Sequence, residues 1–446
     1  MGGTHLYVNA LELLRIGPGP SSARTLGPQR AALRFVHALA ADGHASRVFR
    51  VEVHLFGALA LAAREAGTEA AVVAGLAGDL PEHSDARSLL RRRHDVSGEG
   101  LALGGGARIA FDPRRDVRLH MGKAMAFGSN AVRFDAFDAA GGTLASALYV
   151  TRDSGDVLHE DEPHPALPSG RVPYRLGTGE EILAACRTHG KKVPDLVRAN
   201  ECVFRSPDEL RAGLARIGLA MRGAVERGLA TREALPGGRL RQALHTAQAL
   251  GPDAPAATRC AVYAAAVAEE SASGGCVVSA PTHGAAGPVA ALLEHWRRDA
   301  AVHDDRRAGD FLLTAALIGR MAQAAGLRQA GCQGAVGLAS GMAAAGYVAA
   351  LGGSAQQVLY AAERALDAHW GLACDEMHAR MQDPCIERNA AGATHALDAA
   401  HRALREPAPR LAFDSLVRGM VETGRGMAGR HKDDALAGLA RNVADC

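Results

Sequence analysis

Three cysteines in the second half of the chain stand in segments with little other chemistry. Cys332 lies in "GCQGAVGLASGMAAAG", and Cys374 and Cys385 lie in "LACDEMHARMQDPCIERNA". A glycine inside a helix costs about 1 kcal/mol relative to alanine. A segment with so many glycines around one cysteine therefore needs a reason. Three thiolates from separate segments can hold three irons of a [4Fe–4S] cluster and leave the fourth iron open as a Lewis acid. The spacing is not the C-x-x-C of zinc or ferredoxin sites, and on this stretch alone a cysteine in a close Ala/Gly helix contact is the simpler explanation.

Composition sets the broad class of the protein. The chain has 446 residues, and its 50 Lys+Arg against 48 Asp+Glu give no indication of binding to nucleic acid or to a membrane surface. No apolar run is long enough to span a membrane, and the N-terminus lacks the pattern of a signal peptide. We therefore expect a cytoplasmic protein whose 8 cysteines do not form disulfides.

Strand and helix patterns divide the chain. Alternating segments such as "SRVFRVEVHLF" and "AVRFDAFDA" predict strands in the first part, with helical patches between them. From about residue 178 the strand patterns stop and helical spacing dominates. The sequence predicts an α+β protein with a small N-terminal α/β-sandwich-like domain (1–160), a linker (161–177) and a larger all-α domain (178–446).

Several motifs resemble one known family. They are "IGPGPSSARTLGPQRA", "VEVHLFGALA", "AEESASGGCVVSAPTHGAAGPV", "GCQGAVGLASGMAAAG" and "DPCIERNA". Over nearly its whole length the chain resembles the bacterial iron–sulfur L-serine dehydratases. The resemblance implies that Cys332, Cys374 and Cys385 ligate a [4Fe–4S] cluster. It also implies loss of the α-proton and of hydroxide from serine, which gives pyruvate and ammonia.

The last residue is also a cysteine. In single-chain members of this family a terminal cysteine can cap the open iron, so the resemblance implies that Cys446 is an inhibitory fourth ligand. The alternative is a thiol in a frayed tail.

The chain departs from the family pattern where substrate should bind. The family's S-S-S-H-T is Ser21, Ser22, Ala23, Arg24 and Thr25 here, so its histidine is replaced by arginine. The histidine of its G-K-G-H-x-T-D motif is Ala66. The glutamate of G-C-Q-G-E-V-G is Ala335, and the asparagine of A-P-T-N-G-A is His283. Both histidines usually available for acid–base work are therefore missing.

These changes identify candidate catalytic residues. His283 is a candidate replacement base, or else a surface or helix-cap histidine. Arg24 can clamp a carboxylate or phosphate, or else is a solvated loop arginine.

Hydroxyl-bearing and small residues near these positions are candidates for binding the substrate, although such hydroxyls often only cap helices. The candidate set consists of Ser21, Ser22, Thr25, Ser279, Thr282 and Gly284.

Three functions stay open. The first is a [4Fe–4S] lyase acting on L-serine, and the second is a divergent lyase acting on another β-hydroxy or β-substituted amino acid in a biosynthetic pathway. The third is a cluster-bearing sensor or binding protein without catalysis. The resemblance further implies a homodimer, with a small amino acid as the substrate and part of the active site between the domains.

Overall fold

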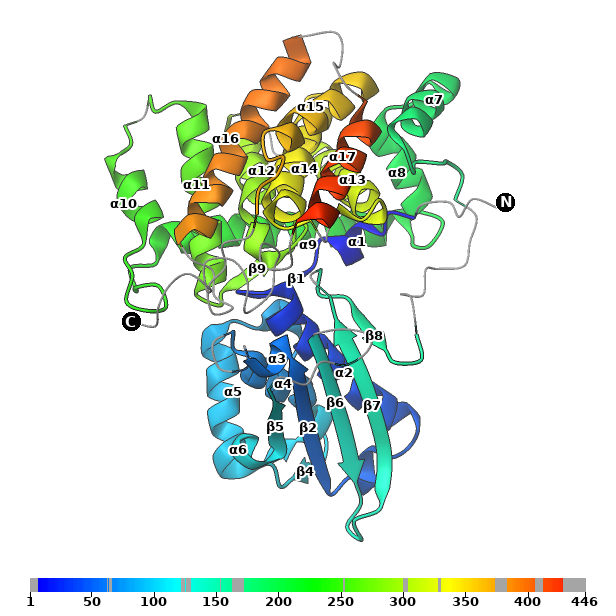
Figure 1. The fold of residues 1–446 in the computed structure, drawn as a ribbon, viewed down its shortest axis with the longest axis vertical. Coiled ribbons are helices and arrows are strands. Elements are labelled where there is room, and N and C mark those ends of the chain that lie inside the picture. The colour runs from blue at the N-terminus through cyan, green and yellow to red at the C-terminus, as the bar shows by residue number, and fades with distance from the viewer. Residues whose placement is uncertain are drawn as a thin grey trace.

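The fold consists of a sheet-containing part and a helical part, which meet along one junction (Figure 1). The predicted α+β architecture is confirmed. None of the helices that can be described is long and apolar enough to cross a membrane. The computed structural model describes residues 7–61, 63, 66–121, 125, 130–152, 154–162, 172–251, 253–299, 304–327, 330–373, 383–405 and 412–427.

The sheet-containing part is built on five strands in the order β5-β2-β6-β7-β8. Only β2 and β5 are parallel; the other neighbours are antiparallel. The five strands are β2 (Arg50–Gly57), β5 (Val117–His120), β6 (Asn130–Phe137), β7 (Thr143–Thr151) and β8 (Val157–His159). The remaining elements are α2 (Gly27–Ala41), α3 (Ala58–Leu61), α4 (Thr68–Ala77), α5 (Ala86–Glu99), β3 (Leu101–Ala102), β4 (Arg108–Ile109) and α6 (Pro113–Asp116).

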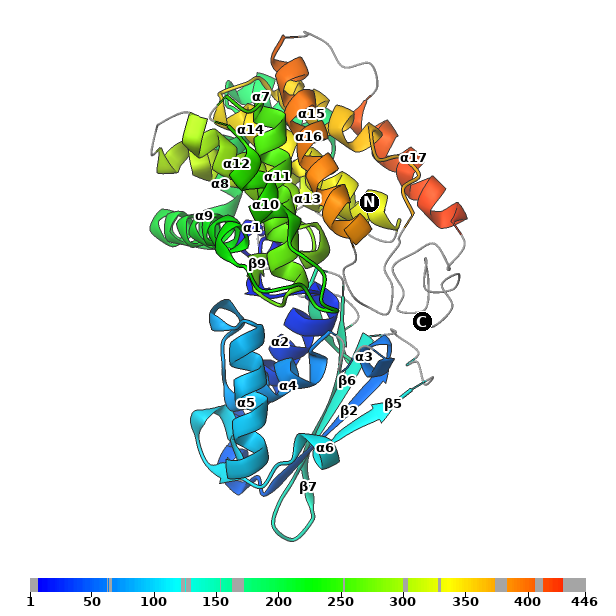
Figure 2. The same cartoon turned by 90° about the vertical axis from the view of Figure 1, so that its left-hand side faces the viewer.

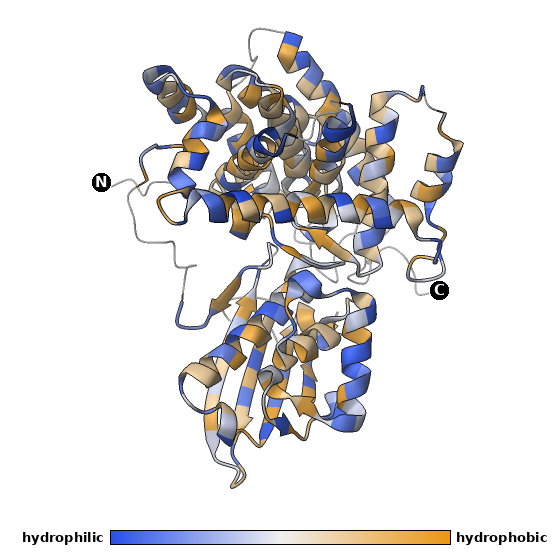
Figure 3. Ribbon diagram, turned by 180° about the vertical axis from the view of Figure 1, so that it is seen from behind, coloured by the Kyte–Doolittle hydropathy of each residue, from blue (hydrophilic) through white to orange (hydrophobic). Residues whose placement is uncertain are grey.

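Alternation along β2 sets the two faces of this sheet. Val51, Val53 and Leu55 are fully buried in a core that they share with α2 and α4. The residues between them point to the opposite face, since side chains alternate along a strand. Figure 2 shows the helices gathered on one side of the sheet. The outermost helix, α5, is mostly polar in Figure 3 and buries only Leu89 and Val96.

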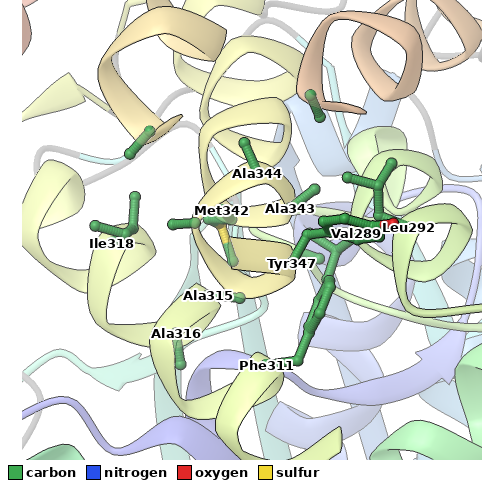
Figure 4. Close-up of a cluster of buried hydrophobic side chains, with 14 of the residues drawn as sticks. Val289, Leu292, Phe311, Ala315, Ala316, Ile318, Met342, Ala343, Ala344 and Tyr347 are labelled. Carbon is green, nitrogen blue, oxygen red and sulfur yellow. The ribbon is translucent and has the colours of Figure 1, made fainter. Parts of the chain in front are cut away.

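The helical part surrounds α14 (Leu338–Ala350), in which every residue is buried. A side chain at Gly346 would lie 2.8 Å from the Phe311 carbonyl oxygen, so α13 approaches too closely for anything larger than glycine. Figure 4 shows Met342 and Tyr347 between side chains of α12 and α13. Close helix packing therefore explains the Gly/Ala run after residue 337. The helices here are α7 (Gly179–His189), α8 (Val193–Glu201), α9 (Pro207–Ala230), α10 (Gln242–Ala249), α11 (Ala256–Ala272), α12 (Gly287–Asp299), α13 (Asp305–Ala324), α15 (Ala355–Asp367), α16 (Asp383–Arg405) and α17 (Phe413–Gly426).

The start of the chain packs with the helical part, although sequence order places it beside the sheet. Helix α1 (Ala10–Leu13) buries Leu13 in the helical core. Strand β1 (Ile16–Pro18) pairs antiparallel with β9 (Cys276–Val278). The chain therefore enters the junction from the helical side before it forms α2.

Candidate active site at the domain junction

The turn η1 (Ser22–Leu26) lies at the junction and leads into α2. Backbone carbonyls on this turn accept hydrogen bonds from two threonines of the sheet-containing part. Thr151 donates to the Ala23 carbonyl at 2.6 Å, and Thr68 donates to the Arg24 carbonyl at 2.6 Å. These two hydroxyl groups thus hold the turn against both β7 and α4.

Two of the predicted substrate-binding hydroxyls hold this turn in place. Ser21 Oγ accepts a hydrogen bond from the Arg24 N–H at 3.2 Å, and Thr25 Oγ1 donates to the Ala66 carbonyl at 2.8 Å. The Ser21 contact is a local cap of the kind that Ser makes at helix starts, whereas the Thr25 contact ties the turn to the segment before α4. Roles for Ser21 and Thr25 in substrate binding stay predictions.

Ser22 joins the two parts of the molecule. Its hydroxyl accepts a hydrogen bond from the His283 N–H at 2.8 Å and lies 3.3 Å from Ser279 Oγ. All three residues are buried. The structure therefore brings together three of the residues that the sequence singled out, from segments far apart along the chain.

The side chain of His283 is fully buried, which excludes the surface-histidine alternative. Neither ring nitrogen meets the geometry of a hydrogen bond with any described residue. Burial lowers the pKa of His283 to about 4, although the nearby carbonyls of Pro18 and Arg15 oppose the shift. The ring is therefore neutral at pH 7, with one donor and one acceptor nitrogen. Buried polar atoms of this kind normally have a partner, so the ring is suited to contact a bound molecule.

Arg24, Thr282 and Gly284 lie on the two turns that carry Ser22 and His283. Arg24 is 4% exposed, which excludes a solvated loop arginine. Thr282 occupies the N-cap position of the short turn η5 (His283–Ala285). At Gly284 the nearest described atom to an added Cβ would be Thr282 Oγ1, 3.9 Å away, so open space adjoins this backbone.

Two of the four predicted cysteine ligands can be placed. Cys332 is buried and directly precedes the turn η7 (Gln333–Gly337). Cys385 lies in the first turn of α16, half-buried beside Leu235 and Ala268. Cys374 and Cys446 lie outside the described residues. Among those described, no group of three or more His, Cys, Asp or Glu side chains could hold a metal ion.

Turn η7 is fastened through Gln333, the residue after Cys332. Its backbone N–H donates to the Leu372 carbonyl at 3.1 Å, and its side-chain oxygen accepts from the Gly371 N–H at 3.0 Å. Its amide nitrogen donates to the Met420 carbonyl of α17 at 3.0 Å. Gln333 thus ties the Cys332 segment to the residues just before Cys374.

Asn389 ties the Cys385 segment to its neighbours in a similar way. The fully buried side chain donates to the carbonyls of Cys385 at 2.8 Å and Gly284 at 2.9 Å. Its oxygen accepts from the Gly287 N–H at 3.0 Å. The sequence did not single out either amide, although Gln333 directly follows Cys332 in "GCQG" and Asn389 lies four residues, about one helical turn, after Cys385 in "PCIERNA".

His369 was also missed, and no sequence signal indicated it. Its Nδ1 lies 2.8 Å from the Ala365 carbonyl oxygen, and its Nε2 has no hydrogen-bond partner among the described residues. Burial lowers its pKa to about 4. An added Cβ at Gly337, the last residue of η7, would lie 2.8 Å from the His369 Cβ, so the histidine packs directly behind the Cys332 turn.

The junction therefore gathers segments that sequence order separates. Turns η5 and η7 contact each other, and both contact α16. Ala285, Val336 and Ala339 form a small apolar cluster at this meeting point. The segments that carry Cys332, Cys385 and His283 are therefore neighbours at the junction.

Comparison with known proteins agrees with this arrangement. Residues 9–162 match the family model "Serine dehydratase beta chain", and residues 188–440 match "Serine dehydratase alpha chain". The chain belongs to the serine dehydratase family. The resemblance seen in the sequence is confirmed, and this family member carries the alpha and beta regions in one chain.

Curated relatives match this serine dehydratase from end to end. L-serine dehydratase of Streptomyces coelicolor is 37% identical, covering 99% of this chain and 100% of its own length. L-serine dehydratase 2 of Escherichia coli is 33% identical, covering 98% of this chain and 100% of its own length. L-serine dehydratase of Mycobacterium bovis is 36% identical, covering 98% and 99%. The chain is therefore an enzyme of this lyase family.

Proposed function

We propose that this serine dehydratase removes water from L-serine, and that the resulting aminoacrylate gives pyruvate and ammonia. The observation that carries the proposal is the meeting of Ser22, Ser279 and His283 with the Cys332 and Cys385 segments. It occurs in a chain that matches L-serine dehydratases over their full length.

The cofactor we propose is a [4Fe–4S] cluster. Cys332, Cys374 and Cys385 would hold it, and Cys446 would be the fourth ligand. The two described thiols fit such a group, because thiolates are the usual ligands of iron–sulfur clusters and these two stand on segments that contact each other. When bound, the cluster supplies a Lewis-acidic iron that polarises the substrate's hydroxyl and carboxylate.

The chain's own residues bind and orient the amino acid. The hydroxyls of Ser22 and Ser279 are hydrogen-bonding groups for the substrate carboxylate, with the backbone at Gly284 close by. The neutral ring of His283 offers a donor and an acceptor in a place closed to bulk water. A base with a pKa of about 4 is weak at pH 7, so His283 is better suited to orient substrate than to remove its α-proton.

Helix α17 supports the proposed role of Cys446. Gln333 bonds to the Met420 carbonyl, and a side chain at Gly424 would collide with Ala330, two residues before Cys332. The last described helix before Cys446 therefore lies beside the Cys332 turn. If Cys446 caps the cluster, Cys446→Ser should lower KM for the amino acid and leave kcat unchanged.

A second candidate is a lyase that acts on another β-hydroxy or β-substituted amino acid. Buried Arg24 favours it, because a guanidinium on the junction turn can bind a second carboxylate or a phosphate bidentately. The third reading, a sensor without catalysis, is the least supported, since the chain matches enzymes throughout. We also propose a cytoplasmic homodimer that binds no nucleic acid.

Anaerobic reconstitution tests the proposal. Iron and sulfide are counted, and keto acid and ammonia are followed with serine, threonine and acidic or β-substituted amino acids. Turnover of serine is the expected result. Turnover of another substrate alone would replace it with the second candidate, and a protein that takes up no iron would contradict the cofactor.

A pair of serine variants makes the test specific to the site. Ser22→Ala should lower kcat/KM, whereas Ser97→Ala on the exposed side of α5 should not.

A further inference from the structure

A cavity in the helical part lies between α8, α9 and α13, with the last turn of α12 beside it. Its volume is about 320 Å³. Small-molecule sites in proteins begin at about 300 Å³. At about 30 Å³ for each water-sized group, the space holds about ten non-hydrogen atoms. The cavity is therefore large enough for a small organic ligand.

This cavity is separate from the candidate active site. Its described lining residues are Arg198, Arg297 and members of the segments 207–215 and 305–309, and none of them belongs to η1, η5 or η7. Figure 2 shows α8, α9 and α12 on the side of the helical part away from α17, the helix that bonds to Gln333 of η7. A ligand in the cavity would therefore leave the junction free.

Apolar side chains form part of the lining. Leu210 and Leu214 lie one turn apart on α9, and Ala308 lies on α13. All three are buried members of the main core of the helical part. A Cβ at Gly309 would lie 3.6 Å from Leu214 Cδ1, so the glycine keeps this part of the cavity open. An apolar chain bound here would remove apolar surface from water, which is favourable.

The rest of the described lining is strongly basic. It contains four arginines and a single aspartate, namely Arg198, Arg211, Arg297, Arg306 and Asp305. A concave surface lined by charges of one sign attracts a ligand of the opposite sign. Guanidinium groups also match the geometry of a carboxylate, because they can donate two parallel hydrogen bonds to it.

Two of these arginines are held in place by carboxylates. Asp310 pairs with Arg198 and lies 3.5 Å from Arg306 Nε, and Arg306 also donates to Asp195 at 2.7 Å. The Nε of Arg198 is buried and donates no hydrogen bond to any described residue. Its Nη1 lies 4.0 Å from the position of a Cβ at Gly309, which also lines the cavity. The Arg198 guanidinium is therefore fixed beside the open space.

Arg297 forms no ion pair with a carboxylate in the part of the chain that the structure describes. Its Nη1 donates to the Gly218 carbonyl at 3.1 Å. Burial and the neighbouring Arg222 lower the pKa of Arg297, although Glu294 and Asp305 oppose the shift. A guanidinium nevertheless stays protonated at pH 7. Its positive charge is thus only partly balanced, and a carboxylate in the cavity would balance it further.

We propose that this cavity is a second binding site, which takes a small carboxylate with an apolar chain of about eight carbons. The carboxylate faces Arg198 and Arg297, and the chain lies along the two leucines of α9. An inorganic anion would leave the apolar lining in contact with water, and a neutral apolar molecule would leave the guanidinium charge unbalanced. The ligand need not be a substrate, so the site does not depend on the reaction proposed for the junction.

Isothermal titration calorimetry on the full-length, anaerobically reconstituted protein tests the chemistry of the ligand. Butyrate, hexanoate and octanoate are the probes, and each added CH₂ should lower Kd about fourfold. Octanoate should therefore bind about 15-fold more tightly than hexanoate. Octanamide keeps the chain but lacks the charge, and it should bind at least about tenfold more weakly than octanoate. Equal affinities for octanoate and octanamide would overturn the inference.

Matched arginine variants test the location of the site. Arg297→Gln should raise Kd for octanoate about tenfold or more, because it removes a charged hydrogen-bond donor. Arg232→Gln removes the same charge from an exposed position outside the described lining, so it should match the wild type. Equal Kd values for the two variants would show that octanoate binds elsewhere.

Gly309→Ala tests the site without any change of charge. The added Cβ meets only ordinary contacts, and alanine is the better helix former, so this variant should fold. It takes up the space of about one CH₂, so Kd for octanoate should rise about fourfold while Kd for butyrate stays unchanged. An unchanged Kd for octanoate in this variant would contradict the proposed position of the chain.

Thermal denaturation gives an independent measurement. A ligand that binds only the folded protein raises Tm as its concentration increases. Octanoate at about 10 mM should raise Tm of the wild type and of Arg232→Gln, and it should raise Tm of Arg297→Gln less. A wild type that shows neither a shift in Tm nor heat of binding at this concentration would overturn the inference.

Discussion

The hydroxyl of Ser22 accepts a hydrogen bond from the backbone N–H of His283 at 2.8 Å, across the junction between the sheet-containing and helical parts. Each residue lies on a short turn that its own part of the molecule holds in place. The bond therefore sets how the two turns face each other. It also joins a buried serine to the backbone of a buried histidine whose ring is neutral at pH 7.

Removal of the Ser22 hydroxyl should lower the free energy of unfolding. Ser22→Ala leaves the buried His283 N–H without its acceptor, which typically costs about 1–3 kcal/mol in the free energy of unfolding. Urea denaturation measures it. Ser97→Ala on α5 is the control and should change stability by less than about 0.5 kcal/mol. Equal stabilities for the two variants would show that the junction bond contributes nothing.

Loss of the Asn389 amide should loosen the cysteine site. Asn389→Leu leaves the Gly287 N–H and the Gly284 carbonyl without their partner, so the free energy of unfolding should fall by about 2–3 kcal/mol. Iron bound after anaerobic reconstitution should fall with it. Thr394→Ala, one turn further along α16, keeps these contacts and is the control. Full iron content in the Asn389 variant would contradict a role in positioning Cys385.

Stability should depend on pH through His283. Its pKa is about 4 in the folded chain and near 6.5 when unfolded, so between these values the unfolded state binds more protons. The free energy of unfolding should therefore fall as pH drops through this window, with His283 contributing up to about 1.4 kcal/mol per pH unit. Above pH 7 it contributes no slope.

Urea denaturation of metal-free protein at pH 7, 6 and 5 measures this slope. His283→Asn should reduce this slope by the amount that corresponds to about one proton. An unchanged slope in that variant would show that His283 is accessible to protons in the folded protein.

Two glycines should respond in opposite ways to alanine. A Cβ at Gly346 would lie within 3.0 Å of three Phe311 atoms, so Gly346→Ala should lower the free energy of unfolding by about 1–3 kcal/mol. Gly98 on α5 has no atom within 4 Å of such a Cβ, so Gly98→Ala should raise stability by about 0.5–1 kcal/mol. Thermal and urea denaturation measure both variants. A neutral Gly346→Ala would mean that α13 and α14 can separate at little cost.

The sequence by itself determined the α+β class, the family and the segments that carry Cys332 and Cys385. These features are local: strand alternation, helical spacing and motifs can be read without knowing which segments meet. The Gly/Ala run around Cys332 is unusual in the sequence, but the sequence does not show what causes it. The buried packing of α14 explains the part of the run after residue 337. The part before it forms the turn η7 (Gln333–Gly337), which is held by the hydrogen bonds of Gln333.

Only the tertiary structure decided what surrounds each candidate residue. It buried His283 and Arg24, engaged Ser21 and Thr25 in hydrogen bonds to the backbone, and paired the start of the chain with β9. The contacts of Asn389 with Gly284 and of His369 with the Cys332 turn likewise join distant segments. A pKa or a hydrogen bond depends on the atoms packed around a group, and that packing is set by strand register and helix docking, which local periodicity does not encode.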